Sequence, residues 1–178
     1  MSNQEASKNN VIDTKNPSWR SELKKQISGK DRTSLSRVKM SELPPNVRNK
    51  NYEEVNRGLT LTEAMQEAKR CLDCPNPGCV QGCPVGIDIP SFIKRIEVGQ
   101  ILDAAKVLKE TSALPAVCGR VCPQEKQCEA LCIHKKMKKE PVAIGYLERF
   151  AADFERESGQ ISVPEVKQRN GIKIAVAG

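Results

Sequence analysis

Residues 71–84 read Cys-Leu-Asp-Cys-Pro-Asn-Pro-Gly-Cys-Val-Gln-Gly-Cys-Pro and place four cysteines within thirteen positions. Four more follow at positions 118, 122, 128 and 132, so all eight cysteines of the chain lie in one window of 62 residues. The first residues, MSNQEASKNN, lack the apolar stretch of a signal peptide, and we therefore expect a cytoplasmic protein, in which thiols stay reduced. We interpret the eight clustered cysteines as metal ligands rather than as four disulfides.

The spacing of the first run, CxxCx4Cx3CP, differs from the bacterial ferredoxin run CxxCxxCx3CP only by two residues in the middle. Three closely spaced thiolates can bind three corners of one 4Fe-4S cluster. In two-cluster ferredoxins the fourth cysteine, which precedes proline, binds the other cluster. The spacing therefore predicts that Cys71, Cys74 and Cys79 share one cluster and that Cys83 belongs to a second.

The second run must supply that second cluster and return one ligand to the first: Cys118-Gly-Arg-Val-Cys122-Pro-Gln-Glu-Lys-Gln-Cys128-Glu-Ala-Leu-Cys132. Cys132 is the expected returned ligand, because it is outermost in its run as Cys71 is in the other. Structural zinc is the main alternative, but zinc modules usually pair CxxC with a distant second CxxC, and this chain has one CxxC only. Glycine lacks a Cβ atom and suits a backbone that folds closely around sulfur, which we expect at positions 78, 82, 86 and 119.

The net charge of +7 lies mainly at the N-terminal end of the chain. Residues 1–50 hold 11 Lys and Arg against 5 Asp and Glu, whereas residues 51–178 hold 18 against 17. With 3% aromatic residues, the nearly neutral cysteine region offers neither a basic groove nor a row of stacking rings. No apolar run approaches the about 20 residues of a membrane span. We therefore expect neither nucleic acid nor a membrane as a partner.

Helical periodicity dominates the chain before residue 171 and predicts an all-α fold, with the cysteines on loops and helix ends. Trp19, Leu23 and Ile27 indicate a short helix, followed by an extended connector over residues 30–50. The capping box Thr60-Leu-Thr-Glu63 predicts a helix from about residue 61 toward the first cysteines. Further helices are expected from Asp88 to Gly99, then around Leu102, Ala105 and Leu108, and from Pro141 to Gly159. The lone His134 is expected to be structural, and the lysines at 135, 136, 138 and 139 to form a solvated face.

The final residues, Gly171-Ile-Lys-Ile-Ala-Val-Ala-Gly178, predict a buried strand, typical of the opening of a dinucleotide-binding βαβ unit. Gly178 would be the first glycine of a truncated FAD-binding turn, so we expect a fragment of a longer chain. The expected organisation is a disordered tail (1–16), an N-terminal helix with an extended connector (17–58), an α-helical di-cluster iron-sulfur domain (59–160), and a linker with the first strand of a truncated FAD/NAD(P)-binding domain (161–178).

Three motifs in this order resemble a known family: CLDCPNPGCVQGCPVGIDIP (71–90), ALPAVCGRVCPQEKQCEALC (113–132) and PVAIGYLERF (141–150). The family is the N-terminal iron-sulfur domain of the small (β) subunit of NADPH-dependent glutamate synthase. The same domain occurs in the large subunit of NADH-dependent ferredoxin:NADP oxidoreductase and in dihydropyrimidine dehydrogenase. The resemblance covers roughly residues 20–178, and it implies an α-helical ferredoxin-like fold with two 4Fe-4S clusters.

The resemblance also implies a ligand set. It puts Cys71, Cys74, Cys79 and Cys132 on one cluster, and Cys83, Cys122 and Cys128 on the other. In several members the last ligand is a Glu or Gln in the motif that corresponds to residues 144–148. That position is Glu148 here, which leaves Cys118 as a spare, whereas spacing alone favours Cys118 as the fourth ligand of the second cluster.

The function that the resemblance implies is electron transfer within a flavin-dependent NAD(P)H oxidoreductase. In glutamate synthase, electrons pass from NADPH to FAD, through the clusters, to the FMN of the large subunit, where glutamine nitrogen and 2-oxoglutarate become glutamate. The fragment would carry electrons and contact the partner, with no catalytic centre of its own. The alternatives are the large subunit of the ferredoxin:NADP enzyme and, in another class, a zinc-stabilised interaction module.

Overall fold

The computed structural model describes residues 18–163 and 171–176, and within them it contains helices and no strand. In chain order the helices are α1 Ser18–Gln26, α2 Gly29–Ser34, α3 Pro45–Arg48, α4 Leu61–Lys69, α5 Gly78–Gln81, α6 Ile89–Glu97, α7 Ile101–Lys109, α8 Pro115–Val121, the 3-10 turn η1 Gln124–Lys126, α9 Ile133–Lys136 and α10 Ile144–Ser158. The all-α prediction is confirmed for the described residues. None of their helices is long and apolar enough to cross a membrane.

The helix boundaries follow local capping chemistry. The Thr60 hydroxyl accepts a hydrogen bond from the Glu63 backbone and the Glu63 carboxylate accepts one from the Thr60 backbone, which confirms the predicted capping box of α4. The Asp88 carboxylate accepts a hydrogen bond from the Ser91 backbone at the start of α6. Gly159 ends α10 with φ 70°, a left-handed conformation that favours glycine.

Three parts of the predicted helix pattern are wrong. Residues 30–50 are not a plain connector, because they hold most of α2 and all of α3. The predicted fourth helix begins at Ile144 rather than at Pro141. The cysteines are not confined to loops and helix ends, since Cys79 lies within α5 and Cys118 within α8. Both helices are short and glycine-containing, so neither shows a clear apolar period in the sequence.

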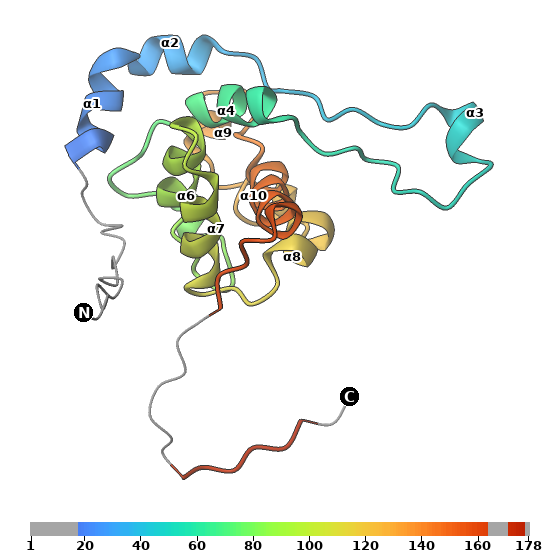
Figure 1. Ribbon diagram of the computed structural model, residues 1–178. Coiled ribbons are helices and arrows are strands. Elements are labelled where there is room, and N and C mark those ends of the chain that lie inside the picture. Colours follow the sequence, from blue (N-terminus) through green and yellow to red (C-terminus); the bar gives the residue numbers. More distant parts are fainter. Residues whose placement is uncertain (1–17, 164–170, 177–178) are drawn as a thin grey trace, which may run out of the picture.

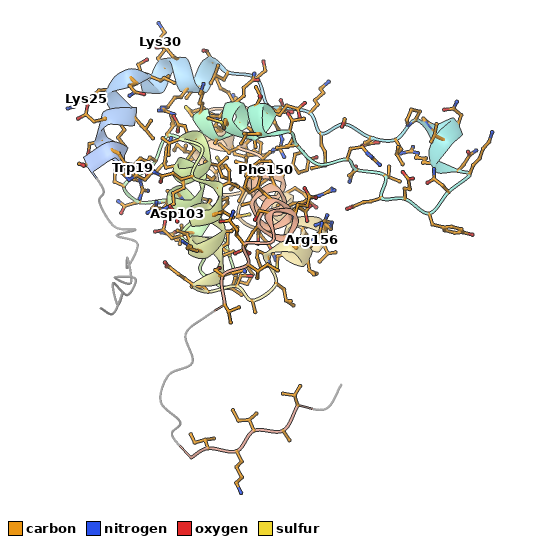
Figure 2. The ribbon with its side chains drawn as sticks, in the orientation of Figure 1. Trp19, Lys25, Lys30, Asp103, Phe150 and Arg156 are labelled. Carbon is orange, nitrogen blue, oxygen red and sulfur yellow. The ribbon has the colours of Figure 1, made fainter. Side chains whose placement is uncertain are left out.

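The apolar core lies between α4, α6, α7 and α10, with α8 packed on α10 (Figure 1). Its members have less than a tenth of their surface exposed and include Ala64, Ala68, Phe92, Ile93, Ile96, Val107, Leu108, Leu147, Phe150 and Ala151. Figure 2 shows Phe150 inside this body and Lys25, Lys30 and Arg156 on its outside. Cys128 and Cys132 belong to the same core, so the cysteine region and the helix core form one packed unit.

Residues 39–57, here called the arm, extend away from the body with α3 near the far end (Figure 1). Its two halves run side by side, with the Leu43 backbone nitrogen 2.8 Å from the Val55 oxygen and the Arg57 nitrogen 2.9 Å from the Ser41 oxygen. Tyr52, at the end of the arm, is fully exposed.

The structure does not confirm the predicted strand at the C-terminal end. Residues 171–176 are exposed and form no strand. The expected tail at 1–16 and the turn glycine Gly178 lie outside the described residues.

Candidate metal centre

Four cysteines line one cavity of about 580 Å³ beside α6. Cys71 and Cys74 follow the C-terminal end of α4, and Cys79 lies in α5. Cys132 immediately precedes α9, which the chain reaches more than fifty residues after Cys79. The structure therefore brings Cys132 to the space lined by the three closely spaced cysteines, as the ligand exchange between the two runs requires. These four residues are called the first cysteine set below.

The walls of this cavity are largely apolar. They include Ile89, Ile93, Leu131, Val142 and Ile144. An apolar wall excludes water and strengthens the electrostatic interaction between any thiolate and a bound cation. The thiols line this space rather than converge on a point, and among the described residues no three His, Cys, Asp or Glu side chains form a site for a single metal ion.

Three thiols of the first set, those of Cys71, Cys74 and Cys79, lie where ionisation is disfavoured. Burial raises the pKa of Cys71, Cys74 and Cys79, and the negative charge of Cys132 raises all three pKa values further. Four thiolates together in a buried space would repel one another strongly unless a positive group lay between them. The iron of a cluster would supply that positive charge, and thiols bind metal in their deprotonated form.

A second set of ionisable side chains is linked by mutual electrostatic influence, and it consists of Cys83, Cys118, Cys122, Cys128 and Glu148. Burial raises the pKa of Cys122, and the charges of Cys118, Glu148 and Cys83 raise it further. Burial also raises the pKa of Cys128 to about 12, with added repulsion from Glu129, Cys83 and Glu148. Cys83 and the second cysteine run thus act on one another electrostatically, although they are distant in the sequence.

Glu148 is the most unusual member of this second set. Its side chain is in α10 and only 6% of the residue is exposed. The buried oxygen Oε1 has no hydrogen-bond partner among the described residues, and burial raises the pKa of the carboxyl to about 7. A buried carboxylate oxygen without a donor is costly, and a metal ion at this point would offset that cost. Cys118 has a partner, since its Sγ lies 3.8 Å from the Ser112 hydroxyl oxygen.

Glycines bring the two cysteine runs together, although not for the expected reason. A Cβ atom on Gly78 would lie 2.7 Å from the Leu131 backbone oxygen, and one on Gly82 would lie 2.7 Å from the Gln127 backbone oxygen. These glycines thus allow α5 to contact residues 127–131 rather than make room for sulfur. Gly145 likewise accommodates Gln124, whose side chain would be 2.4 Å from an added Cβ.

Sequence reasoning missed a group of buried charges beside the first set. Lys94, Glu97 and Arg32 have side chains that are at most 3% exposed, and they pair with one another behind Cys71. The only available signal was the Lys94–Glu97 spacing of three residues on a helix with an apolar face. His134 is fully buried, with Nε2 3.0 Å from the Arg70 backbone oxygen, in keeping with a structural role. The lysines at 135, 136, 138 and 139 are exposed, as expected.

The chain is similar to several oxidoreductases and oxidoreductase subunits. It is 41% identical over 130 residues to the NAD-dependent dihydropyrimidine dehydrogenase subunit PreT of Salmonella typhimurium, covering 72% of this chain and 31% of that protein. It is 37% identical over 145 residues to the small chain of the NADPH glutamate synthase of Escherichia coli, covering 81% of this chain and 30% of that protein. A putative oxidoreductase of Escherichia coli, UacF, is 35% identical over 145 residues, covering 80% and 22%. The chain thus spans less than a third of the length of these relatives.

Residues 48–160, which contain both cysteine sets, match the family described as dihydropyrimidine dehydrogenase domain II, 4Fe-4S cluster. The matched segment begins in the arm and ends directly after α10. The cavity lined by four thiols fits the 4Fe-4S cluster that this description names. The chain therefore belongs to the dihydropyrimidine dehydrogenase domain II family of 4Fe-4S domains.

Proposed function

We propose that this chain transfers electrons through two 4Fe-4S clusters. Cys71, Cys74, Cys79 and Cys132 hold the first cluster. The second is held by Cys83, Cys122, Cys128 and Glu148. The observation that carries the proposal is that the four cysteines of the first set line one largely apolar cavity, although Cys132 is distant in the sequence. When bound, each cluster accepts and releases single electrons.

The protein's own residues prepare these sites. The thiols provide the negative charges that hold iron, the apolar side chains around the cavity exclude water, and close backbone contacts fix the two runs against each other. Glu148 supplies a harder oxygen ligand at the second site, where the neighbouring Cys118 remains a spare thiol.

The longer protein that contains this domain is proposed to be a flavin-dependent NAD(P)H oxidoreductase. A glutamate synthase small subunit, which uses FAD and NADPH and contacts an FMN-containing large subunit, is one candidate. A PreT-type subunit is an equal candidate, because this chain is about as similar to PreT as to the glutamate synthase small chain. The NADH-dependent ferredoxin:NADP oxidoreductase is a further alternative. The full-length protein should distinguish them by its preference for NADPH or NADH and by its response to glutamine with 2-oxoglutarate or to a pyrimidine.

The cluster proposal is tested on protein purified anaerobically. We expect a brown protein with about eight irons per chain whose visible absorbance bleaches on reduction with dithionite. A Cys79→Ser variant should lose the first cluster and about half of the iron, because it removes one thiol of the first set. A colourless chain that carries stoichiometric zinc would instead support the interaction module.

The choice between Glu148 and Cys118 needs a pair of variants. Cys118→Ser should keep both clusters, because the Cys118 thiol is spare. Glu148→Ala should alter the spectrum or the potential of one cluster only, and Glu148→Gln should have a milder effect, since its amide oxygen remains. If Cys118→Ser removes a cluster while Glu148→Ala changes neither, the second site has four cysteine ligands and the Glu148 assignment is wrong.

A further inference from the structure

The ammonium group of Lys94 is buried directly behind the first cysteine set. Lys94 lies in the middle of α6 and its side chain is 1% exposed. Its Nζ atom donates a hydrogen bond to the Cys71 backbone oxygen at 2.6 Å and pairs with Glu97 Oε2 at the same distance. These two contacts, one to the Cys71 backbone and one to the Glu97 carboxylate, hold the ammonium group in place.

The single negative charge of Glu97 does not balance the positive charges around it, because Glu97 pairs with a second buried cation, Arg32, as well as with Lys94. Arg32 Nη1 lies 2.8 Å from Glu97 Oε1, and the Arg32 side chain is 3% exposed. The rest of the Arg32 guanidinium donates only to backbone oxygens of Leu23, Ile27 and Lys69. Two cations and one anion are therefore buried together, which leaves an excess of one positive charge.

The next charges outward do not remove this excess. Asp73, two residues after Cys71, pairs with Arg20 at 2.5 Å and with Lys24 at 3.2 Å. The surroundings of Cys71 thus hold the cations Lys94, Arg32, Arg20 and Lys24 and the anions Glu97 and Asp73. Buried charge without a counter-charge is costly, so this arrangement is favourable only beside an anionic site. Thiolates in the first set make the cavity such a site.

We propose that Lys94 is a positioning residue that fixes the Cys71 backbone and places a positive charge beside the first cluster, so that it raises the potential of that cluster. The inference rests on the proposed function, since it requires a cluster on the first set. Reduction adds one electron, and thus one negative charge, to the cluster.

Two variants of opposite charge effect test this role. Lys94→Met removes the cation while Glu97 keeps its pair with Arg32, and it should lower the potential of the first cluster. Glu97→Gln removes the shared anion while Lys94 keeps its bond to Cys71, and it should raise that potential. Lys106→Met is the matched control, because Lys106 also pairs with an acidic residue three positions away but is about half exposed. It should leave both clusters unchanged.

The measurement is a mediator titration of the anaerobically purified chain, followed by electron paramagnetic resonance. The first cluster is identified as the signal lost in Cys79→Ser. At fixed applied potential we expect each charge variant to change the ratio of reduced to oxidised first cluster at least about tenfold, which equals about 59 mV for one electron. The second cluster provides an internal reference.

Some outcomes would overturn the inference. Equal potentials in wild type, Lys94→Met and Glu97→Gln, with both clusters present, would refute the role of Lys94 and leave the proposed function standing. Shifts in the same direction in both variants would show a structural disturbance instead. If Lys94→Met does not fold, two other variants test the inference. Glu97→Gln should raise the potential of the first cluster, and Lys94→Arg, which keeps the positive charge, should leave it unchanged. A wild-type chain without a cluster on the first set would refute both proposals.

Discussion

Gly119 of α8 and Arg149 of α10 approach so closely that a Cβ atom on Gly119 would lie 2.6 Å from the Arg149 backbone nitrogen. The two helices thus touch backbone to backbone. Cys118 directly precedes Gly119 in α8, Cys122 is the residue that caps the end of this helix, and Glu148 directly precedes Arg149 in α10. The contact therefore sets the distance between the thiol and the carboxylate members of the second set.

Replacing Gly119 by alanine should separate the two helices. Alanine normally favours a helix over glycine by about 1 kcal/mol, so a loss of stability would come from the clash alone. We expect Gly119→Ala to lower the free energy of unfolding by about 1–3 kcal/mol. The second cluster should be lost or altered while the first is retained, as measured by iron content and electron paramagnetic resonance.

Gly29→Ala is the control for this change. Gly29 is also helical, and an added Cβ would meet only the Leu72 side chain at an ordinary 3.9 Å. Its unfolding free energy should stay within about 0.5 kcal/mol of the wild type or rise. Equal behaviour of the two variants would show that α8 and α10 adjust to the extra atom.

Arg149 also fastens the arm to the helix that carries Glu148. Its guanidinium donates to the Asn56 backbone oxygen at 2.8 Å and pairs with Glu54 and Asp153. We expect Arg149→Met to loosen the arm and to speed amide hydrogen exchange at Leu43 and Arg57, which pair across it, by about tenfold or more, a change of about 1.4 kcal/mol.

The matched control is Arg156→Met. Arg156 pairs with the same carboxylate, with Nη2 3.1 Å from Asp153 Oδ1, but its side chain is 61% exposed and it does not contact the arm. It should leave exchange at Leu43 and Arg57 unchanged. Equal acceleration in both variants would mean that the charge balance at Asp153, rather than the Arg149 contact, holds the arm.

The sequence was informative wherever the interactions are local. The Thr60–Glu63 capping box, the Asp88 cap and Gly159 mark the helices α4, α6 and α10, because each signal depends on residues within one turn. The spacing of the cysteines likewise grouped Cys132 with Cys71, Cys74 and Cys79, and these four residues line one cavity. The assignment of ligands to two clusters stays a prediction.

The sequence was uninformative where the partners are distant. Arg32 pairs with Glu97, and Arg37 with Glu129, across 65 and 92 positions, so no local pattern reveals them. The close approach of Gly119 to α10 was also hidden, because a glycine in a short helix has several possible reasons. These long-range contacts are the ones that position α8 and place positive charge behind Cys71.

Glu67 joins three distant segments and should be one of the most sensitive positions outside the cysteines. Its carboxylate is fully buried, pairs with Arg70 at 2.6 Å, and accepts hydrogen bonds from the backbone nitrogens of Val38 and Ala143. In Glu67→Gln the side-chain NH2 group, itself a donor, would face a backbone N–H of Val38 or Ala143, and Arg70 would lose its counter-charge. We expect a loss of about 3–5 kcal/mol in the free energy of unfolding, measured by urea denaturation.

Glu157→Gln provides the comparison, because the Glu157 side chain is 73% exposed and its contact with Arg156 is 3.9 Å long. The unfolding free energy of this variant should remain within about 0.5 kcal/mol of the wild type. A similarly small loss in Glu67→Gln would show that the backbone of residues 38 and 143 finds other partners.

Removal of iron should unfold the cysteine segments before the helix core. Residues 71–88 and 122–140 contain few helical residues, and their packing depends on thiols that repel one another when ionised. Helices α6, α7 and α10 share an apolar core of their own. After chelation of all iron, we expect amide protection to be lost in the two cysteine segments and partly kept in these helices, because ligand binding energy at such sites is also folding energy.

The measurement is hydrogen exchange on the same preparation before chelation, after it, and after reconstitution with iron and sulfide. Reconstitution should restore protection in residues 71–88 and 122–140, which excludes irreversible damage as the cause of its loss. Cys118→Ser serves as the control variant, since loss of a spare thiol should change neither the protected state nor its recovery. Native-like protection of both cysteine segments in a chain free of iron would contradict the prediction, because the fold would then stand without its metal.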